Sequence, residues 1–218
     1  MTDLDPENTA TADRARKPGT ADVRAEILAR AQKVFLEQGY EAASMREIVK
    51  ASGFSKPTLY SHFGSKERLF EAIITSVCDR ISLPDVAVPR DMSAREVLES
   101  LVLAYRRTVL NPDFIELYRL VIAEAKRFPE LGAIFYKSGP QASRWQLAEI
   151  LQSLLDRGLL AGLGDTQIAA EQFEALVLEP IKLRAFLLPE ETVSETQFRT
   201  HAQAAIELFL RALDPHRT

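Results

Sequence analysis

The sequence predicts an all-α protein on three observations. Apolar residues recur at helical spacing along most of the chain, as Val23, Ile27, Ala31 and Val34 show near its start. No segment alternates apolar and polar residues in the way a half-buried strand does. Only nine of the 218 residues are glycine, which argues against a fold rich in hairpin turns. We therefore expect helices throughout.

The composition excludes several other classes of protein. Apolar residues make up 46% of the chain and charged residues 27%, so wholesale disorder is excluded. The single cysteine, Cys78, allows no internal disulfide, which fits a reducing cytoplasmic location. The longest apolar runs are far shorter than the roughly 18 residues of a membrane span, and no secretory signal is visible at the start. We expect a cytoplasmic protein without a membrane span.

The first 19 residues are expected to form a flexible arm, because they contain almost no large apolar side chain. Two interpretations of its basic residues Arg14, Arg16 and Lys17 stay open: a solvated tail, or an arm that contacts nucleic acid. A helical pattern begins after residue 19 and is expected to end near Gly39.

Two short helices are predicted next, joined by a tight turn. Ser44 and Glu47 have the spacing of a capping box, which starts a helix that ends at Gly53. Ser55 can cap the following helix, which ends at Gly64. A fourth helix then runs from residue 65 to about residue 80. The arrangement is a helix-turn-helix.

The third predicted helix has the surface of an element that enters a DNA groove. It contains no acidic residue, and Leu59 and Phe63 share its inward face. Its other positions carry Lys56, Thr58, Tyr60, Ser61 and His62. Residues 23–70 have a net charge of +3 in a chain of charge −4. Simple packing of short helices is the alternative, but the acid-free face favours a recognition helix.

Helices resume after a proline-containing linker over residues 82–91. Ser93 and Glu96 form a second capping box that opens one helix, which Asn111 and Pro112 close. The remaining helices are expected over residues 114–125, 131–139, 141–157, 165–187 and 194–213, the second of them ended by Gly139 and Pro140.

Several motifs between Ile27 and Phe70 occur in a familiar order. They are Ile27-Leu28, Phe35, Gly39-Tyr40, Met45-Arg46-Glu47-Ile48, Ala51-Ser52-Gly53-Phe54-Ser55-Lys56, Thr58-Leu59-Tyr60, His62-Phe63, Ser65-Lys66-Glu67 and Leu69-Phe70. In this set the chain resembles the N-terminal DNA-binding domain of the TetR family of transcriptional regulators. Val49 departs from it, since the family usually has alanine there. Residues 118–131 are more loosely similar to the AefR-like effector domain.

The resemblance implies a DNA-binding domain over residues 20–81 and a helical ligand-binding and dimerisation domain over residues 92–218. It implies a homodimer on double-stranded operator DNA. The side chains that would face bases are Lys56, Pro57, Thr58 and Ser61, with Arg46 at a position that reaches a base in some members. Those that would contact phosphates are Ser44, Tyr60, His62 and Lys66.

An effector cavity is expected within the second domain, where aromatic residues are dense. They are Tyr105, Phe114, Tyr118, Phe135, Tyr136 and Trp145, with Glu124 and Arg144 as the charged residues nearby. Ordinary core packing is the alternative, but together they suggest a site for a small hydrophobic or aromatic molecule.

The last two helices carry apolar stripes that suit either a dimer interface or the chain's own core. One stripe contains Phe173, Leu176, Val177 and Ile181, and the other Phe198, Ala202, Ile206 and Phe209.

The sequence therefore favours a ligand-responsive repressor that leaves a palindromic operator when a small molecule binds. A promoter-activating role would use the same helix. The alternative is a small-molecule-binding or adaptor protein of the same fold that does not bind operator DNA. No enzyme, metal site or cofactor is expected, since the three histidines lack ligand partners at helical spacing and neither a glycine-rich phosphate loop nor a nucleophile elbow occurs.

Overall fold

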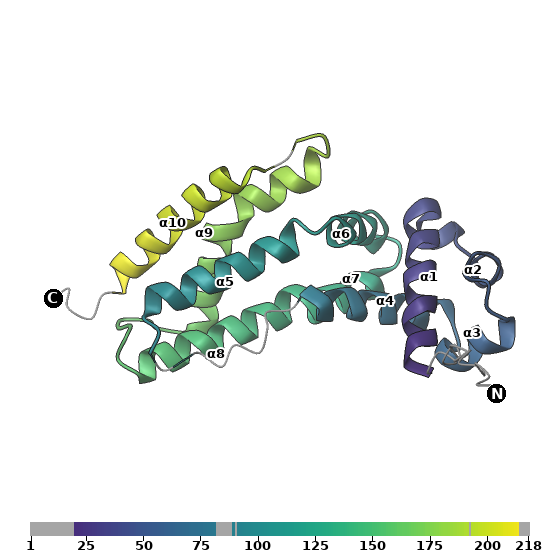
Figure 1. Cartoon of the computed structure of the whole chain (residues 1–218), viewed down its shortest axis with the longest axis horizontal. Helices are drawn as coiled ribbons and strands as arrows, with labels where there is room; N and C mark the ends of the chain where they lie inside the picture. The colour runs from purple at the N-terminus through teal and green to yellow at the C-terminus, as the bar shows by residue number, and fades with distance from the viewer. Residues whose placement is uncertain (1–19, 82–88, 90, 192, 214–218) are drawn as a thin grey trace, which may run out of the picture.

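The computed structural model describes residues 20–81, 89, 91–191 and 193–213, and every regular element of this part is helical (Figure 1). The all-α prediction is confirmed. The arm predicted over residues 1–19 and most of the predicted linker lie outside the described residues. The first four helices are α1 (Thr20–Ala42), α2 (Met45–Ser52), α3 (Lys56–Phe63) and α4 (Lys66–Ile81).

The larger helical body follows. It contains α5 (Ala94–Val109), α6 (Pro112–Ala125), α7 (Pro129–Tyr136), the π-helical turn η1 (Lys137–Gln141), α8 (Ala142–Asp156), α9 (Thr166–Leu187) and α10 (Glu195–Ala212). Figure 1 shows α1, α2 and α3 at one end of the molecule and α9 and α10 toward the other, with α4 and α6 between them. None of the described helices is long and apolar enough to cross a membrane.

The predicted helix starts and stops are present as local hydrogen bonds. The side chains of Ser44 and Ser93 each accept a hydrogen bond from the backbone N–H of the glutamate three residues later. The carboxylate of that glutamate in turn accepts a hydrogen bond from the backbone N–H of the serine. Gly53 ends α2 with φ of +70°, a conformation that glycine adopts without a steric penalty. Gly39 interrupts α1 with φ of +81°, close to the predicted end of that helix.

One predicted helix end is wrong. Gly139 and Pro140 were expected to end a helix, but the chain continues turning through η1 and joins α7 to α8. Pro140 has no N–H to donate to a regular helical ladder, and the wider π turn accommodates it without breaking the helical path. Glycine and proline therefore produce a widened turn here, and this turn borders a cavity described below.

Two hydrophobic cores hold the molecule together, and they do not divide at the predicted linker. One core joins α5, α8, α9 and α10, with Phe173 and Phe198 fully buried in it. The other joins α1 to α4 with α6 and α7, so that Phe35 and Phe70 share a core with Leu117. Because α6 and α7 share this core with α1 to α4, the N-terminal helices pack directly against the larger helical body.

Candidate functional site

The α3 helix presents a polar surface on a firmly packed base. Leu59 and Phe63 are 0% and 5% exposed, which anchors its inner face in the core. Ser55 caps its start by accepting a hydrogen bond from the Thr58 amide at 3.3 Å. On the outer face Tyr60 is 41% exposed, and the Lys56 ammonium lies 5.5 Å from the centre of its ring. The helix therefore projects donors and an aromatic ring from a rigid support.

The other residues predicted to face DNA lie around this surface and differ in how exposed their side chains are. Arg46, Pro57 and Ser61 are exposed, whereas Thr58 and His62 are half-buried. The Ser61 hydroxyl donates to the Thr58 carbonyl at 2.8 Å. Ser44 is exposed and already uses its hydroxyl in the cap of α2. These residues come from α2, α3 and their caps, so the fold brings them to one end of the molecule.

Lys66 differs from the simple phosphate contact that was expected. Its ammonium donates to the Glu41 carbonyl at 2.9 Å and lies 4.5 Å from the centre of the Tyr40 ring. Partial burial lowers its pKa, while Glu67 and Glu124 oppose that shift. In this structure Lys66 therefore holds the end of α1, and its contact with a phosphate stays a prediction.

The contact between the N-terminal helices and the body was not anticipated from the sequence. The Tyr40 amide donates to Glu124 Oε1 at 3.1 Å, and the Tyr40 ring meets the Phe128 ring edge-on at 4.9 Å. Arg127 pairs with Glu41 beside them. Gly39 is needed for this approach, since a Cβ there would lie 3.3 Å from Glu124 Oε1 and its φ is positive. We call this set of contacts the α1–α6 joint.

A cavity of about 170 Å³ lies between α4, α5, α6, the end of α7, η1, α8 and α9. Four of the six aromatic residues proposed for the effector site line it: Tyr105, Phe114, Tyr118 and Tyr136. Phe135 is buried behind them, with its ring 5.3 Å from that of Tyr118. Trp145 does not line the cavity and is 60% exposed, because it lies on the outer face of α8.

Of the two charged residues expected near the effector site, Arg144 lines the cavity and Glu124 does not, while Glu174 and Lys182 line it and were not expected. Arg144 donates through Nε to Glu174 at 2.9 Å, and its Nη1 is 3.4 Å from the Tyr136 hydroxyl. Burial alone would lower the pKa of Arg144, but Glu174 and Tyr136 raise it overall. Glu174 falls on the buried face of α9 beside Phe173. An acid on an apolar helix face is the sequence signal that would have found it.

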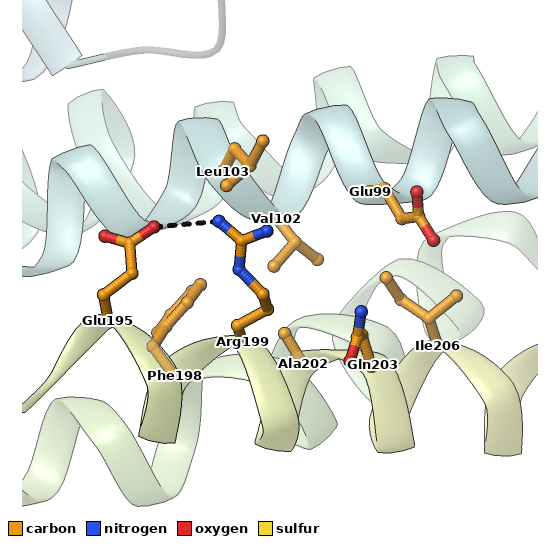
Figure 2. Close-up of a pocket in the computed structure, with 9 residues that line it drawn as sticks. All are labelled: Glu99, Val102, Leu103, Glu195, Phe198, Arg199, Ala202, Gln203 and Ile206. Carbon is orange, nitrogen blue, oxygen red and sulfur yellow. Dashed lines mark hydrogen bonds and ion pairs between the residues drawn. The ribbon is translucent and has the colours of Figure 1, made fainter.

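The described part of the body has further hollows besides this cavity. A groove of about 110 Å³ between α5 and α10 is lined by Leu103 and Phe198. Glu195 and Arg199, which form an ion pair, also line it (Figure 2). None of the six aromatic residues expected at the effector site lines it.

The outer face of α9 and α10 holds a larger hollow of about 930 Å³. Ile168, Leu176 and Leu208 line it and are exposed. The stripe residues predicted on these two helices are buried within the chain's own core, Leu176 excepted. The exposed apolar surface of α9 and α10 therefore shares Leu176 with the predicted stripes, while most of the stripe residues face the chain's own core.

Family models match both halves of the chain. The model for the C-terminal domain of AefR-like transcriptional repressors matches residues 96–214. The model for bacterial regulatory proteins of the tetR family matches residues 27–73.

Curated relatives are similar over the N-terminal helices. The transcriptional repressor ComR of Escherichia coli is 44% identical over 55 residues, which is 25% of this chain and 26% of ComR. The transcriptional activator FasR of Mycolicibacterium smegmatis is 43% identical over 58 residues, 27% of this chain and 26% of FasR. The match spans about a quarter of the length of these relatives.

Solved structures match the whole architecture. A TetR-family transcriptional regulator from Mesorhizobium loti has a TM-score of 0.79 and 29% identity, covering 90% of this chain and 99% of that one. The flavonoid-responsive regulator FrrA has a TM-score of 0.77 and 32% identity over the same shares. With both domain models in their expected places, the chain belongs to the TetR family of transcriptional regulators.

Proposed function

We propose that this regulator is a ligand-responsive repressor, which binds a palindromic operator as a homodimer and leaves it when a small hydrophobic or aromatic molecule fills the body. One observation carries the proposal. Helix α6 lines the cavity with Phe114 and Tyr118, and Glu124 near its other end holds Tyr40 of the N-terminal helices. A single helix thus contacts both the ligand site and the DNA-binding part.

The DNA contact is assigned to the exposed surface of α3. In this assignment Lys56, Pro57, Thr58 and Ser61 face base edges, and Arg46 joins them from α2. Tyr60, His62, Ser44 and Lys66 contact phosphates. Support comes from the exposed, acid-free helix on a buried base, which is the form of a recognition helix in the major groove.

The homodimer is assigned to the outer face of α9 and α10. Ile168, Leu176 and Leu208 leave apolar surface exposed there, around the largest of the hollows described above. Apolar faces of two helices packed on their symmetry mates make a four-helix core, and a two-fold interface uses the same patch twice. Dimers are typical of the family, which supports this use of the face.

Release from DNA follows if the ligand favours one position of α6. A ligand shifts an equilibrium only through its different affinities for the two states. Filling the cavity beside Phe114 and Tyr118 would stabilise one placement of α6, and the α1–α6 joint would pass this to the DNA-binding helices. The name of FrrA states a flavonoid response for that relative, which supports a small-molecule response here. Of the two N-terminal relatives, ComR is a repressor and FasR an activator, so support for repression comes from the model of AefR-like repressors that matches residues 96–214.

The test is a band shift with the DNA that flanks the protein's own gene, repeated on scrambled DNA of equal length. The full chain is expected to bind the flanking DNA tightly and the scrambled DNA only weakly, with binding that falls steeply as salt rises. A transcription reporter driven by the bound segment should be lower with the protein than without it. Equal binding to both DNAs would leave the adaptor alternative, and a raised reporter signal would contradict repression.

A further inference from the structure

The turn between α2 and α3 is tied to α1 by an arginine side chain. Arg30 of α1 donates a hydrogen bond through Nη1 to the Ser52 carbonyl at 2.8 Å, across 22 positions of sequence. Ser52 is the last residue of α2. A cation is favourable at this end of a helix, because the last carbonyls lack partners within the helix and carry negative partial charge. The bond therefore joins α1 to the point where α2 ends and the turn begins.

The same guanidinium contacts the next two residues of the turn. Its central carbon lies 5.9 Å from the centre of the Phe54 ring, and a Cβ at Gly53 would lie 3.4 Å from Nη1. Glu26, one helical turn earlier on α1, pairs with Nη2 of Arg30. A planar guanidinium can make these contacts together, because its N–H groups point in fixed directions and its face stacks on aromatic rings. We call Arg30 with its contacts to Ser52, Gly53 and Phe54 the turn clamp.

The turn also has hydrogen bonds of its own. The Ser52 hydroxyl is buried, donates to the Val49 carbonyl at 3.2 Å and accepts from the Phe54 amide at 3.4 Å. The Gly53 amide donates to the Val49 carbonyl at 3.2 Å. These local bonds fix the shape of the turn, whereas Arg30 fixes its position on α1.

The position of the turn matters because α3 begins directly after it. Leu59 and Phe63 hold the inner face of α3 in the core, but apolar burial has no preferred direction. A hydrogen bond does have one. Lys56, the first residue of α3, follows closely after Gly53, and the N-terminal residues of a recognition helix are those that contact base edges. The turn clamp therefore acts at the end of α3 where a small displacement changes base contacts most.

We infer that Arg30 is a positioning residue for DNA recognition, which acts through the Ser52 carbonyl and orients the start of α3. This inference rests on the assignment of α3 to DNA in the proposed function, and it is independent of the ligand and of the sign of regulation. The Arg30 side chain is 47% exposed, whereas Ile27 and Ala31 carry the buried face of α1. Replacing Arg30 therefore leaves the core intact.

The test is Arg30→Met, which keeps an unbranched side chain and removes the guanidinium. Band shifts measure its affinity for a duplex that the wild-type chain enriches from a randomised pool, and for a scrambled duplex of equal length. The ratio of the two affinities should fall on the order of tenfold, the effect of about one lost base contact. Partial unfolding would not imitate this result, because it lowers both affinities by the same factor.

A direct phosphate contact by Arg30 gives a different result. It would weaken both duplexes alike and reduce the slope of log affinity against log salt by about 0.9. That result, or an unchanged ratio in a protein whose wild type does enrich a sequence, would overturn the inference alone. Failure of the wild-type chain to enrich any sequence would reject the DNA contact of the proposed function, and the inference with it.

A control variant and a measurement without DNA complete the test. Lys33→Met removes one charge from another exposed position of α1, and the affinity ratio should stay at its wild-type value. In Arg30→Met without DNA, the amides of Gly53 and Phe54 should exchange with solvent several-fold faster than in wild type, while that of Ala31 in α1 keeps its rate. Unchanged exchange at both turn amides would overturn the role of the turn clamp.

Discussion

Glu124 Oε1 accepts a hydrogen bond from the Tyr40 amide at 3.1 Å, across 84 positions of sequence. Tyr40 is 3% exposed, and Glu67, Glu130 and Glu124 add to the burial that raises the pKa of its phenol to about 12. The bond joins the end of α1, next to the DNA-binding helices, to the helix that borders the cavity. It connects the N-terminal helices directly to the helix that borders the cavity.

Glu124→Ala should remove this connection. We expect a loss of about 1–2 kcal/mol in the free energy of unfolding, since a carboxylate hydrogen bond is lost from a half-buried place. DNA release by ligand should weaken, while DNA and ligand each still bind. Urea unfolding and a band shift with added ligand measure the two effects.

Glu124→Gln is the conservative partner of that variant, because an amide oxygen still accepts the Tyr40 N–H. It should retain most of the stability and the ligand response. Glu149→Ala, on the exposed surface of α8, is the control for loss of a carboxylate. Wild-type ligand response in Glu124→Ala would contradict the role of the α1–α6 joint.

Substitutions on α3 should separate phosphate from base contacts. Tyr60→Ala should weaken binding to all DNA sequences by a similar factor, on the order of tenfold, because phosphate contacts carry no sequence information. Lys56→Ala should instead change which sequence is preferred. Selection from randomised duplexes measures both, with Arg199→Ala on α10 as the distant control. Unchanged affinity and preference in both α3 variants would rule out α3 as the recognition helix.

The outer face of α9 and α10 predicts a variant that separates the subunits. Leu208→Glu places a charge at an exposed apolar position on that face and should give a monomer at micromolar concentration. Light scattering measures the mass. Leu103→Glu makes the same change on α5 and should leave the dimer intact. A dimer in Leu208→Glu, or a wild-type monomer, would count against this interface.

The capping box of α5 predicts an acid-dependent part of the stability. The Ser93 side chain and backbone lower the pKa of Glu96 by donating hydrogen bonds to it. Glu96 therefore binds a proton more readily in the unfolded chain than in the folded one. The capping box stabilises the folded chain fully at pH values above the unfolded pKa of Glu96, and this contribution is lost as the pH falls through the folded pKa.

Glu96→Gln keeps the cap without the titrating group, as Gln197 does opposite Ser194 in α10. The unfolding temperature of wild type should fall more steeply than that of the variant between about pH 5 and pH 3. Parallel pH profiles would show that this carboxylate contributes no acid sensitivity.

The helix-turn-helix could be predicted from the sequence because its signals are local. Ser44 and Glu47 bond across three residues, and Gly53 takes its positive φ from its own lack of a side chain. Leu59 and Phe63 share a face because of helical periodicity alone. Each of these features depends on neighbours within about one helical turn, so the sequence determined them by itself.

Tertiary structure decided how distant segments use the remaining residues. Trp145 shares the aromatic character of its neighbours, but the packing of α8 turns it outward. Glu174 is buried only because α9 brings it to Arg144 of α8, and Lys66 is engaged only because α1 ends beside it. The α1–α6 joint likewise needs two segments far apart in the chain. Residue type and periodicity define a helix face, but the partner that covers this face is chosen by the packing of the whole chain.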